Sequence, residues 1–252
     1  MFFCTKIALI LVAGWWSWPA TPSPTPAPTP IVVQTTPTPT PTAIPSRPIF
    51  ESPEVPELSP LGENLVINFE VGGRSEYNQH PEAPDARFSG ITQGLGYDDS
   101  QNAPTVIVED WRSLGATNAQ RLAATHPYIG RAAQSHLHEV RDIVVPWMSA
   151  YEVFNKIDVA RTWSQCERAF PGFENLRANA QAAIVSLVFN RGASMTGDNR
   201  KEMRAIRDAV PKHDYTEMAS QLRKMVRVWV GTDIYNGMKR RRLAEADLVL
   251  TP

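Results

Sequence analysis

One acidic side chain, Glu70, stands where a helix is expected to end in apolar surroundings. It is flanked by Phe69 and Val71 and followed by Gly72 and Gly73. Burial against such a wall raises the pKa of a carboxyl group, because desolvation disfavours the charged form. A protonated Glu70 could then donate a proton to a leaving oxygen near neutral pH. Taken alone, a glutamate at a helix end is usually just a solvated side chain.

A second group of polar side chains occurs in the segment 90–98, GITQGLGYD. In an extended strand, alternation would place Thr92, Gly94, Gly96 and Asp98 on one face. The two glycines would let a substrate approach the backbone, while the hydroxyl and the carboxylate could hold and activate a water. The same segment could equally be a glycine-rich hairpin without any site.

The element that must position Glu70 is a helix beginning at Pro60, since proline suits a first helical turn and Ser59 suits the cap. Its apolar residues are predicted on one face: Leu61, Leu65, Val66 and Phe69. Residues 72–110 lose the helical period and carry glycines and prolines, which predicts irregular structure with one short hairpin.

From about Thr117 onward the periodicity predicts helices almost throughout. The stretch 180–190 is apolar on nearly all sides, so it should be the central helix of the core, stopped by Arg191 and a left-handed Gly192. Two further apolar stripes are predicted in the core: Met203, Ile206 and Val210, and then Met218, Leu222, Met225, Val226 and Trp229. A last helix is expected over 237–250. This order predicts a predominantly helical α+β fold with two lobes and a cleft between them.

The N-terminal part of the chain differs sharply in composition. The first 60 residues hold 14 of the 22 prolines. Residues 1–20 resemble a signal peptide, with Lys6 before an apolar run, although an uncleaved membrane anchor stays open. Residues 21–58 alternate proline with small or hydroxyl residues and predict an extended polyproline spacer. The folded domain is expected over 59–252, exported to the periplasm or the cell exterior.

Charge and cysteine content exclude several classes of protein. Residues 61–252 carry 23 Lys+Arg and 23 Asp+Glu, which argues against a nucleic-acid binder that relies on net charge. Only Cys4 and Cys166 are present, too few for a disulfide framework or a cysteine-rich metal site. Cys166 is expected to be a buried structural thiol. No phosphate-binding loop or dinucleotide fingerprint occurs, so we expect neither a cofactor nor a metal.

Taken in order, four motifs resemble the phage-type lysozymes, most closely the pesticin-like muramidases. These motifs are NFE ending at Glu70, GITQGLGYD, SLVFNRG at 186–192 and KRRRLAEADL at 239–248. In that family a helix-terminal glutamate, a T-x-G-x-G turn, an aliphatic helix ending in N-x-G and an arginine-rich last helix follow one another. The resemblance spans nearly all of 60–250 and implies a lysozyme-like fold.

The resemblance also implies roles for individual residues. Glu70 would be the general acid, and Thr92 would help to position the attacking water. Compact phage enzymes carry an aspartate six residues before that threonine, where this chain has Ala86. The pesticin-like pattern places it at Asp98, which we prefer, with Asp85 as the alternative. A further departure is Gln93, where the family has a hydrophobic residue. Substrate contacts are implied for Gly94, Gly96, Tyr97, Asn190 and Arg191.

The activity implied is hydrolysis of the β-1,4 bond between N-acetylmuramic acid and N-acetylglucosamine in peptidoglycan, with inversion and by a monomer. The basic run 239–242 could attract the anionic wall, or could simply be solvated at a helix end. Two alternatives stay open. A lytic transglycosylase would cleave the same bond with one glutamate, and a non-catalytic wall-binding domain would keep only the fold.

Overall fold

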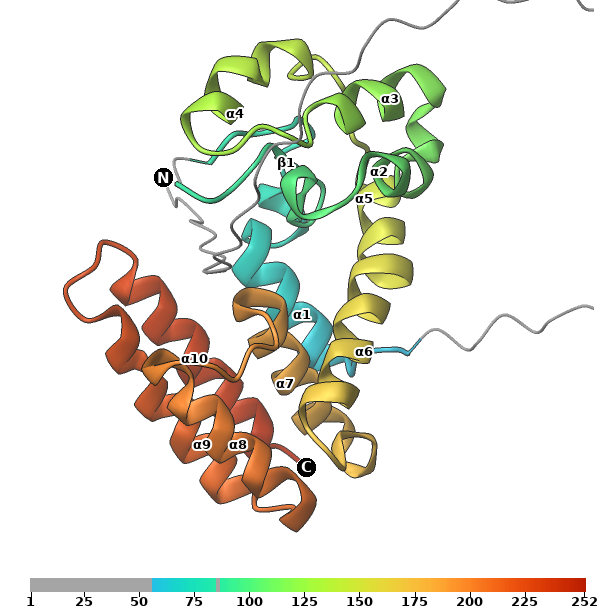
Figure 1. Cartoon of the computed structure of the whole chain (residues 1–252). Helices are drawn as coiled ribbons and strands as arrows, with labels where there is room; N and C mark the ends of the chain where they lie inside the picture. The colour runs from blue at the N-terminus through green and yellow to red at the C-terminus, as the bar shows by residue number, and fades with distance from the viewer. Residues whose placement is uncertain (1–55, 85–86) are drawn as a thin grey trace, which may run out of the picture. The chain divides into compact units, whose positions relative to one another are not determined.

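The computed structural model describes residues 56–84 and 87–252 (Figure 1). The predicted leader at 1–20, nearly all of the predicted spacer at 21–58 and the alternative carboxylate Asp85 lie outside these ranges. Leu58, the last residue of the predicted spacer, is described and is only 9% exposed, so it belongs to the core.

The described residues are mainly helical, with one very small sheet. The helices are α1 Pro60–Val71, α2 Pro104–Asp110, α3 Ala116–Ala124, α4 Arg131–His136, α5 Trp147–Val153, α6 Ala160–Ala169, α7 Ala178–Arg191, α8 Lys201–Ala209, α9 Tyr215–Lys224 and α10 Tyr235–Leu250. The strands are β1 Thr92–Gln93 and β2 Tyr97–Asp98, paired antiparallel. This confirms a predominantly helical, lysozyme-like α+β fold.

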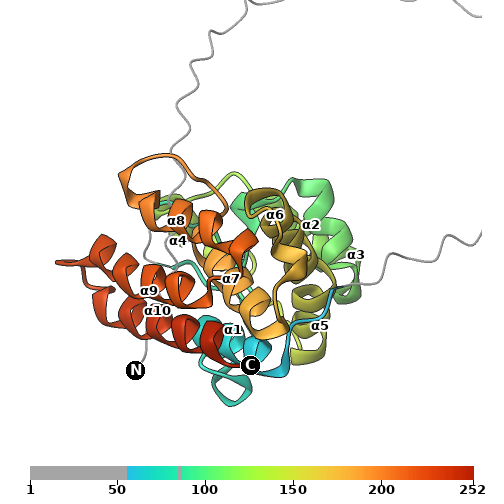
Figure 2. The same cartoon turned by 90° about the horizontal axis from the view of Figure 1, so that it is seen from below.

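Helix α7 is the centre of the core, as its all-round apolar sequence predicts. Helices α1, α6 and α10 each pack against it, and Figure 2 shows it between them. The stop is also confirmed, since Gly192 follows Arg191 with a φ of 70°. The two predicted stripes are buried, apart from Val226, which is half-buried.

Helix α1 begins and ends where the sequence predicts, but its buried face is rotated from the predicted one. Ser59 Oγ caps the N-terminus by accepting from Gly62 N at 3.2 Å. Of the predicted apolar face, Val66 is buried and Leu65 and Phe69 are half-buried, whereas 55% of Leu61 is exposed. The neighbouring Gly62 is buried instead, and a Cβ atom there would lie 2.1 Å from Ala182 Cβ on α7. The two helices cross so closely that only glycine fits.

Substitution Gly62→Ala is therefore expected to destabilise the fold by about 1–3 kcal/mol, because α1 must move away from α7. The matched control is Gly237→Ala in α10, where an added Cβ meets nothing within 4 Å. That change should stabilise the helix by roughly 0.5–1 kcal/mol. Denaturant unfolding of both variants measures the difference. Equal stability of the two would mean that the close crossing is not present in solution.

The region 72–110 is irregular with one hairpin, as predicted, but its last part is not irregular. Residues 104–110 form helix α2, with Pro104 in its first turn. The apolar run Val106–Val108 is flanked by polar residues. It is too short to show a helical period, so the sequence did not indicate this helix. Beyond α3 and α4, the helices α5 and α6 are joined without a break by a π-helical stretch, Phe154–Val159, and form the long yellow helix of Figure 1.

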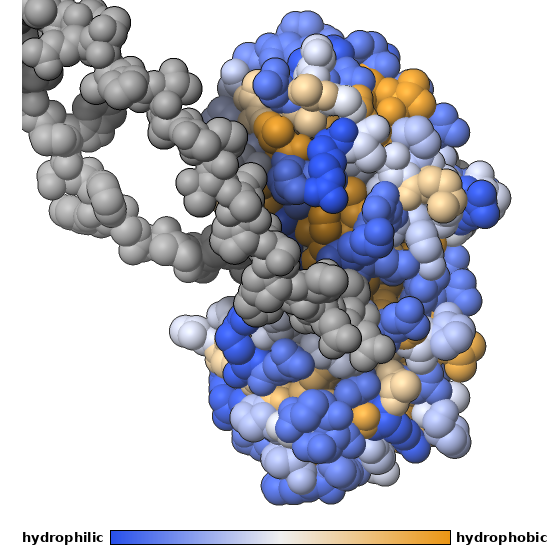
Figure 3. All heavy atoms as spheres, turned by 90° about the vertical axis from the view of Figure 1, so that its right-hand side faces the viewer, coloured by the Kyte–Doolittle hydropathy of each residue, from blue (hydrophilic) through white to orange (hydrophobic). Residues whose placement is uncertain are grey.

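The surface seen from the side of α5 and α6 is mostly hydrophilic, with apolar residues showing in a few patches (Figure 3). Within the described residues, no helix is both long and apolar enough to cross a membrane. Cys166 is fully buried, as expected for a structural thiol, and burial raises the pKa of its thiol well above the usual range.

Candidate active site

Glu70 lies in the last turn of α1 and is only 7% exposed. The helix stops directly after it, because Gly72 adopts a left-handed conformation with a φ of 75° and its N–H donates to Asn68 O at 3.0 Å. This αL stop turns the chain away within two residues of the carboxylate. The predicted placement of Glu70 at the buried end of a helix is confirmed.

The surroundings of Glu70 are not purely apolar, because the buried Arg241 of α10 contacts it. Arg241 Nη1 donates to Glu70 Oε1 at 2.8 Å, and its guanidinium lies 5.7 Å from the centre of the Phe69 ring. The other nitrogens of Arg241 donate to Ser186 O and Oγ at 3.2 Å and to Glu245 Oε1 at 3.3 Å. The cation favours the ionised form of Glu70, opposing the effect of burial.

A second buried arginine completes this cluster. Arg242 Nη2 forms an ion pair with Glu245 Oε1 at 2.9 Å, and Ser186 Oγ donates to the same oxygen at 2.7 Å. Burial acts to lower the pKa of Arg241, but Glu70 and Glu245 outweigh it and raise that pKa above its ordinary value. Arg242 has less compensation, and burial lowers its pKa to about 10. The buried cluster thus contains two arginines, Arg241 and Arg242, and two glutamates, Glu70 and Glu245.

This cluster corrects the interpretation of the basic run 239–242. Only Lys239 and Arg240 are exposed, whereas Arg241 and Arg242 are 3% and 0% exposed. Because Arg241 and Arg242 are buried, they neither attract the anionic cell wall nor lie solvated at a helix end. The spacing Arg241 to Glu245, four residues apart on one helix, was the available signal, together with a lone serine inside the apolar α7.

The small sheet brings Thr92 and Asp98 together, since they pair directly across the hairpin. Asp98 Oδ1 accepts from Gly90 N at 3.1 Å, from Ser100 N at 2.9 Å and from Ser100 Oγ at 2.7 Å. All three bonds end on one oxygen, so they fix the carboxylate while its Oδ2 takes no part in them. Thr92 Oγ1 donates to Glu82 O over a long 3.4 Å.

The glycines of this segment do not share a strand face with Thr92 and Asp98. The chain reverses at once through Gly94 and Gly96, whose φ values are 62° and 98°. A Cβ at Gly94 would lie 2.7 Å from Trp111 Cη2, so the space beside this glycine is filled by the protein's own tryptophan. The expectation of one extended strand is wrong, because the segment forms a hairpin.

Tyr97 is 2% exposed and packs edge-on against Trp111 at 5.4 Å between ring centres. Its hydroxyl donates to Asp110 Oδ2 at 2.7 Å, and Arg161 Nη2 donates to the same oxygen at 2.6 Å. Burial, and then the hydrogen bond to Asp110, raise the pKa of Tyr97 far above its ordinary value. These contacts tie the hairpin to α2 and α6.

The two residues at the end of α7 are also engaged by the protein. Asn190 Oδ1 accepts from Arg242 Nη2 at 3.0 Å, while Arg191 Nη2 donates to Asn199 O at 2.7 Å. Arg191 is 9% exposed and its guanidinium lies 4.7 Å from the centre of the Trp229 ring. Burial lowers its pKa to about 9, aided by the like charges of Arg200 and Arg242. Substrate contact by this pair stays a prediction.

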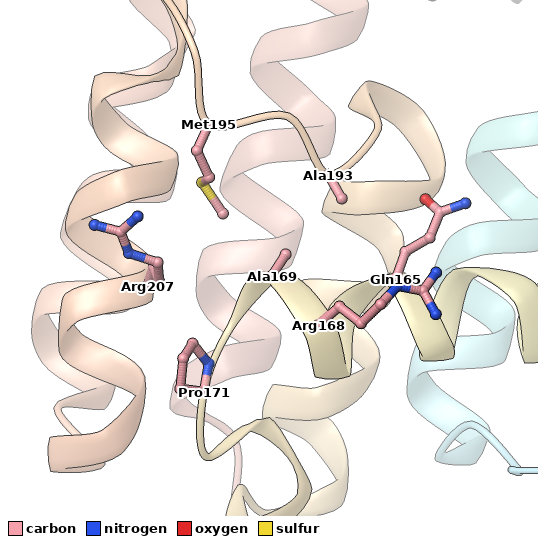
Figure 4. Close-up of a pocket in the computed structure, with 7 residues that line it drawn as sticks. All are labelled: Gln165, Arg168, Ala169, Pro171, Ala193, Met195 and Arg207. Carbon is pink, nitrogen blue, oxygen red and sulfur yellow. The ribbon is translucent and has the colours of Figure 1, made fainter.

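A surface hollow lies apart from these residues, between α6, α8 and the loop after α7. It measures about 550 Å³, and Figure 4 shows the side chains around it. It is lined by Gln165, Arg168, Ala169, Pro171, Ala193, Met195 and Arg207. None of these is a predicted site residue. Within the described part of the chain, no group of acidic, histidine or cysteine side chains is arranged to hold a metal ion.

The small hairpin beside a helical lobe built around α7 defines a lysozyme-like fold. Comparison with known families agrees, because the phage lysozyme family matches residues 117–245, just over half of the chain. The chain belongs to the phage lysozyme family. No curated protein matches it. The family implies a peptidoglycan hydrolase of the lysozyme type.

The matched range covers the helical part and not the whole site. It contains Arg241 and Glu245, but Glu70, Thr92 and Asp98 all precede it. The family assignment and the geometry around Glu70 are therefore separate lines of argument. They meet at Arg241, which belongs to the matched range and binds Glu70 directly.

Proposed function

We propose that the protein is an N-acetylmuramidase of the pesticin-like branch, which hydrolyses the β-1,4 bond between N-acetylmuramic acid and N-acetylglucosamine. The observation that carries this proposal is the buried Glu70 at the end of α1, held by Arg241 at 2.8 Å. A carboxyl group fixed in this way has one orientation, which general acid catalysis requires.

The proposed reaction uses two carboxyl groups in different states. Glu70 donates its proton to the glycosidic oxygen as the bond from that oxygen to C1 breaks. A water attacks C1 and passes a proton to the Asp98 carboxylate, with the hydroxyl of Thr92 helping to orient it. Inversion follows if the water attacks from the face opposite the leaving group, for which about 6.5–9.5 Å between the carboxyls is typical. Asp98 Oδ2 is the oxygen available for this water, since Oδ1 already accepts three bonds.

The site favours hydrolysis over the lytic transglycosylase alternative. A transglycosylase needs a single glutamate, whereas here Asp98 is held by three hydrogen bonds and lies directly opposite Thr92. Asp98 also caps the 3-10 turn Asp99–Gln101, because its side chain accepts from Ser100 N. A non-catalytic wall-binding domain could use the same cap, so the released products distinguish it from a hydrolase.

Delivery is part of the proposal. We propose that residues 1–20 direct export or form an anchor, and that the proline-rich residues after them hold the catalytic part away from the membrane. The protein would then act on the cell wall as a monomer, from the periplasm or the cell exterior. Blocking signal peptidase and measuring the mass of the mature protein would distinguish cleavage from anchoring.

The test of the activity is digestion of purified peptidoglycan by the full chain, with the released muropeptides identified by mass spectrometry. A muramidase gives new reducing N-acetylmuramic acid ends. A transglycosylase gives anhydro-muramic products, which are lighter by one water. Wall binding without any released product would support the non-catalytic domain and would overturn the proposal. NMR of the anomeric proton of the new end, read before mutarotation, reports inversion or retention.

A further inference from the structure

A fully buried carboxyl group, Asp99, lies next to the proposed site and has no part in the proposed reaction. It follows Asp98 directly and begins the 3-10 turn Asp99–Gln101. Its Oδ1 accepts from Gln93 Nε2 at 2.6 Å, and its Oδ2 lies 2.7 Å from Thr125 Oγ1. Asp99 therefore joins β1 of the hairpin to the C-terminal end of α3, where Thr125 is the cap.

The hydrogen bonds of Thr125 locate a proton on Asp99. Thr125 Oγ1 lies 2.7 Å from Asp99 Oδ2 and 2.8 Å from Leu122 O, both within hydrogen-bond distance. A hydroxyl group has only one proton to donate. If Asp99 were ionised, the single hydroxyl hydrogen of Thr125 would have to be shared between the two contacts. A separate hydrogen bond at each contact needs a second hydrogen, and since a carbonyl oxygen carries no proton, that hydrogen comes from Asp99.

The electrostatic surroundings agree with a neutral Asp99. No cation is among the causes of the pKa shift of Asp99, and the ionisable groups that face it within the described residues are Asp98 and His126, whose Nδ1 lies 3.3 Å from the Asp99 backbone oxygen. Burial raises the pKa of Asp99 to about 8, against the opposing effect of the hydrogen bond that Gln93 donates, and the charge of Asp98 raises it further. A hydrogen bond donated by Asp99 to Thr125 stabilises the neutral form as well. An isolated buried carboxylate would be costly, because it has lost water without gaining a cation.

We propose that Asp99 is a positioning residue that works as a neutral carboxylic acid. It donates to Thr125, accepts from Gln93, and so fixes the hairpin on which Thr92 and Asp98 lie. The role assigned to Asp98 rests on the proposed function. The protonation of Asp99 does not, since it follows from the hydrogen bonds alone.

This assignment also gives a physical reason for Gln93. The family resemblance expects a hydrophobic residue there, but Gln93 is 3% exposed and its amide donates to Asp99. The polar side chain and the neutral acid are partners, so each satisfies a group that would otherwise be buried without a hydrogen bond. The hairpin of this chain is thus held by a polar contact where its relatives use apolar packing.

The stability of the fold should depend on pH in a definite direction. Asp99 keeps its proton in the folded state to about pH 8, while in the unfolded chain it loses it near its ordinary value of 3.8. Between these values the folded state binds more protons, so the contribution of Asp99 to stability falls as pH rises and is fully lost above about pH 8. Substitution Asp99→Asn mimics the neutral acid and removes this dependence.

The experiment compares Asp99→Asn, Asp99→Ala and the control Asp110→Asn in the full chain. Asp110 is also a buried aspartate, but it is ion-paired with Arg161 at 2.6 Å. Substitution Asp110→Asn should therefore lower the stability of the fold at neutral pH. In contrast, the difference in thermal midpoint between Asp99→Asn and the unmodified chain should grow in favour of the variant from pH 4 to pH 8 and then stay constant. Asp99→Ala should lose stability at every pH, because Gln93 and Thr125 lose their partner.

Two further measurements decide the proposal. Carbon NMR of the Asp99 carboxyl should show it protonated at pH 6, with its midpoint near pH 8. Turnover of peptidoglycan at the optimal pH should be unchanged in Asp99→Asn and lost in Asp99→Ala. A carboxyl that titrates in the ordinary range, or an Asn variant as damaged as the Ala variant, would overturn it. If the unmodified chain has no activity, the proposed function fails while the NMR and stability results still decide the state of Asp99.

Discussion

Replacing Glu70 by glutamine is expected to lower turnover of peptidoglycan by about 10²–10⁴-fold, which is the range that general acid catalysis contributes. The amide has the shape of the carboxyl and its oxygen can still accept from Arg241, at present 2.8 Å from Oε1. It cannot supply an acidic proton to the leaving oxygen. The released reducing ends, measured at saturating substrate, give the loss directly.

The matched control for this substitution is Glu63→Gln on the same helix. Glu63 lies two turns before Glu70, is half-buried and accepts from Tyr151 at 2.9 Å. The same chemical change there should leave turnover unaltered. Binding of the inactive variant to insoluble wall should persist, because glutamine keeps the shape of the glutamate side chain. Full activity in Glu70→Gln would mean that another residue is the acid, and the proposed mechanism would fail.

The elements that position Glu70 could be predicted from the sequence because local signals act together there. Ser59 and Pro60 begin α1 and Gly72 ends it, and each acts only on the turn of the helix in which it lies. The all-apolar helix α7 was equally predictable, since only a core position tolerates such a face. What failed was the choice between Leu61 and Gly62 as the inward residue. That choice depends on how closely α7 approaches, which no local pattern encodes.

The chemistry around the glutamate was less predictable. Arg241 is separated from Glu70 by 171 positions, so no local pattern links them. The preceding Lys239 and Arg240 are exposed, and the sequence does not show that Arg241 differs from them in burial. In the hairpin, Gln93 looked like a flaw in the family pattern. Gln93 donates a hydrogen bond to Asp99, and the two side chains meet only in the folded hairpin. Residues that act through distant partners escape sequence periodicity for this reason.

The second large effect is expected for Arg241→Met, which should destabilise the fold by about 3–5 kcal/mol. Removing the cation leaves Glu70 buried without its ion pair and takes one of three donors from Glu245 Oε1, whose remaining donors are Arg242 and Ser186. Methionine matches the length and packing of the arginine stem, so the lost charge dominates the result. Denaturant unfolding of the full chain measures the change. Arg240→Met, one residue earlier and exposed, is the control and should change stability by less than about 0.5 kcal/mol.

A double variant separates the ion pair from the packing of the arginine. In Glu70→Gln with Arg241→Met, no uncompensated carboxylate is left at position 70, so the double variant should be more stable than Arg241→Met alone. The two changes then show a coupling energy, as residues in direct contact do. If the two losses simply add, Glu70 and Arg241 do not interact in solution. The orientation of the acid would then need a cause other than the ion pair with Arg241.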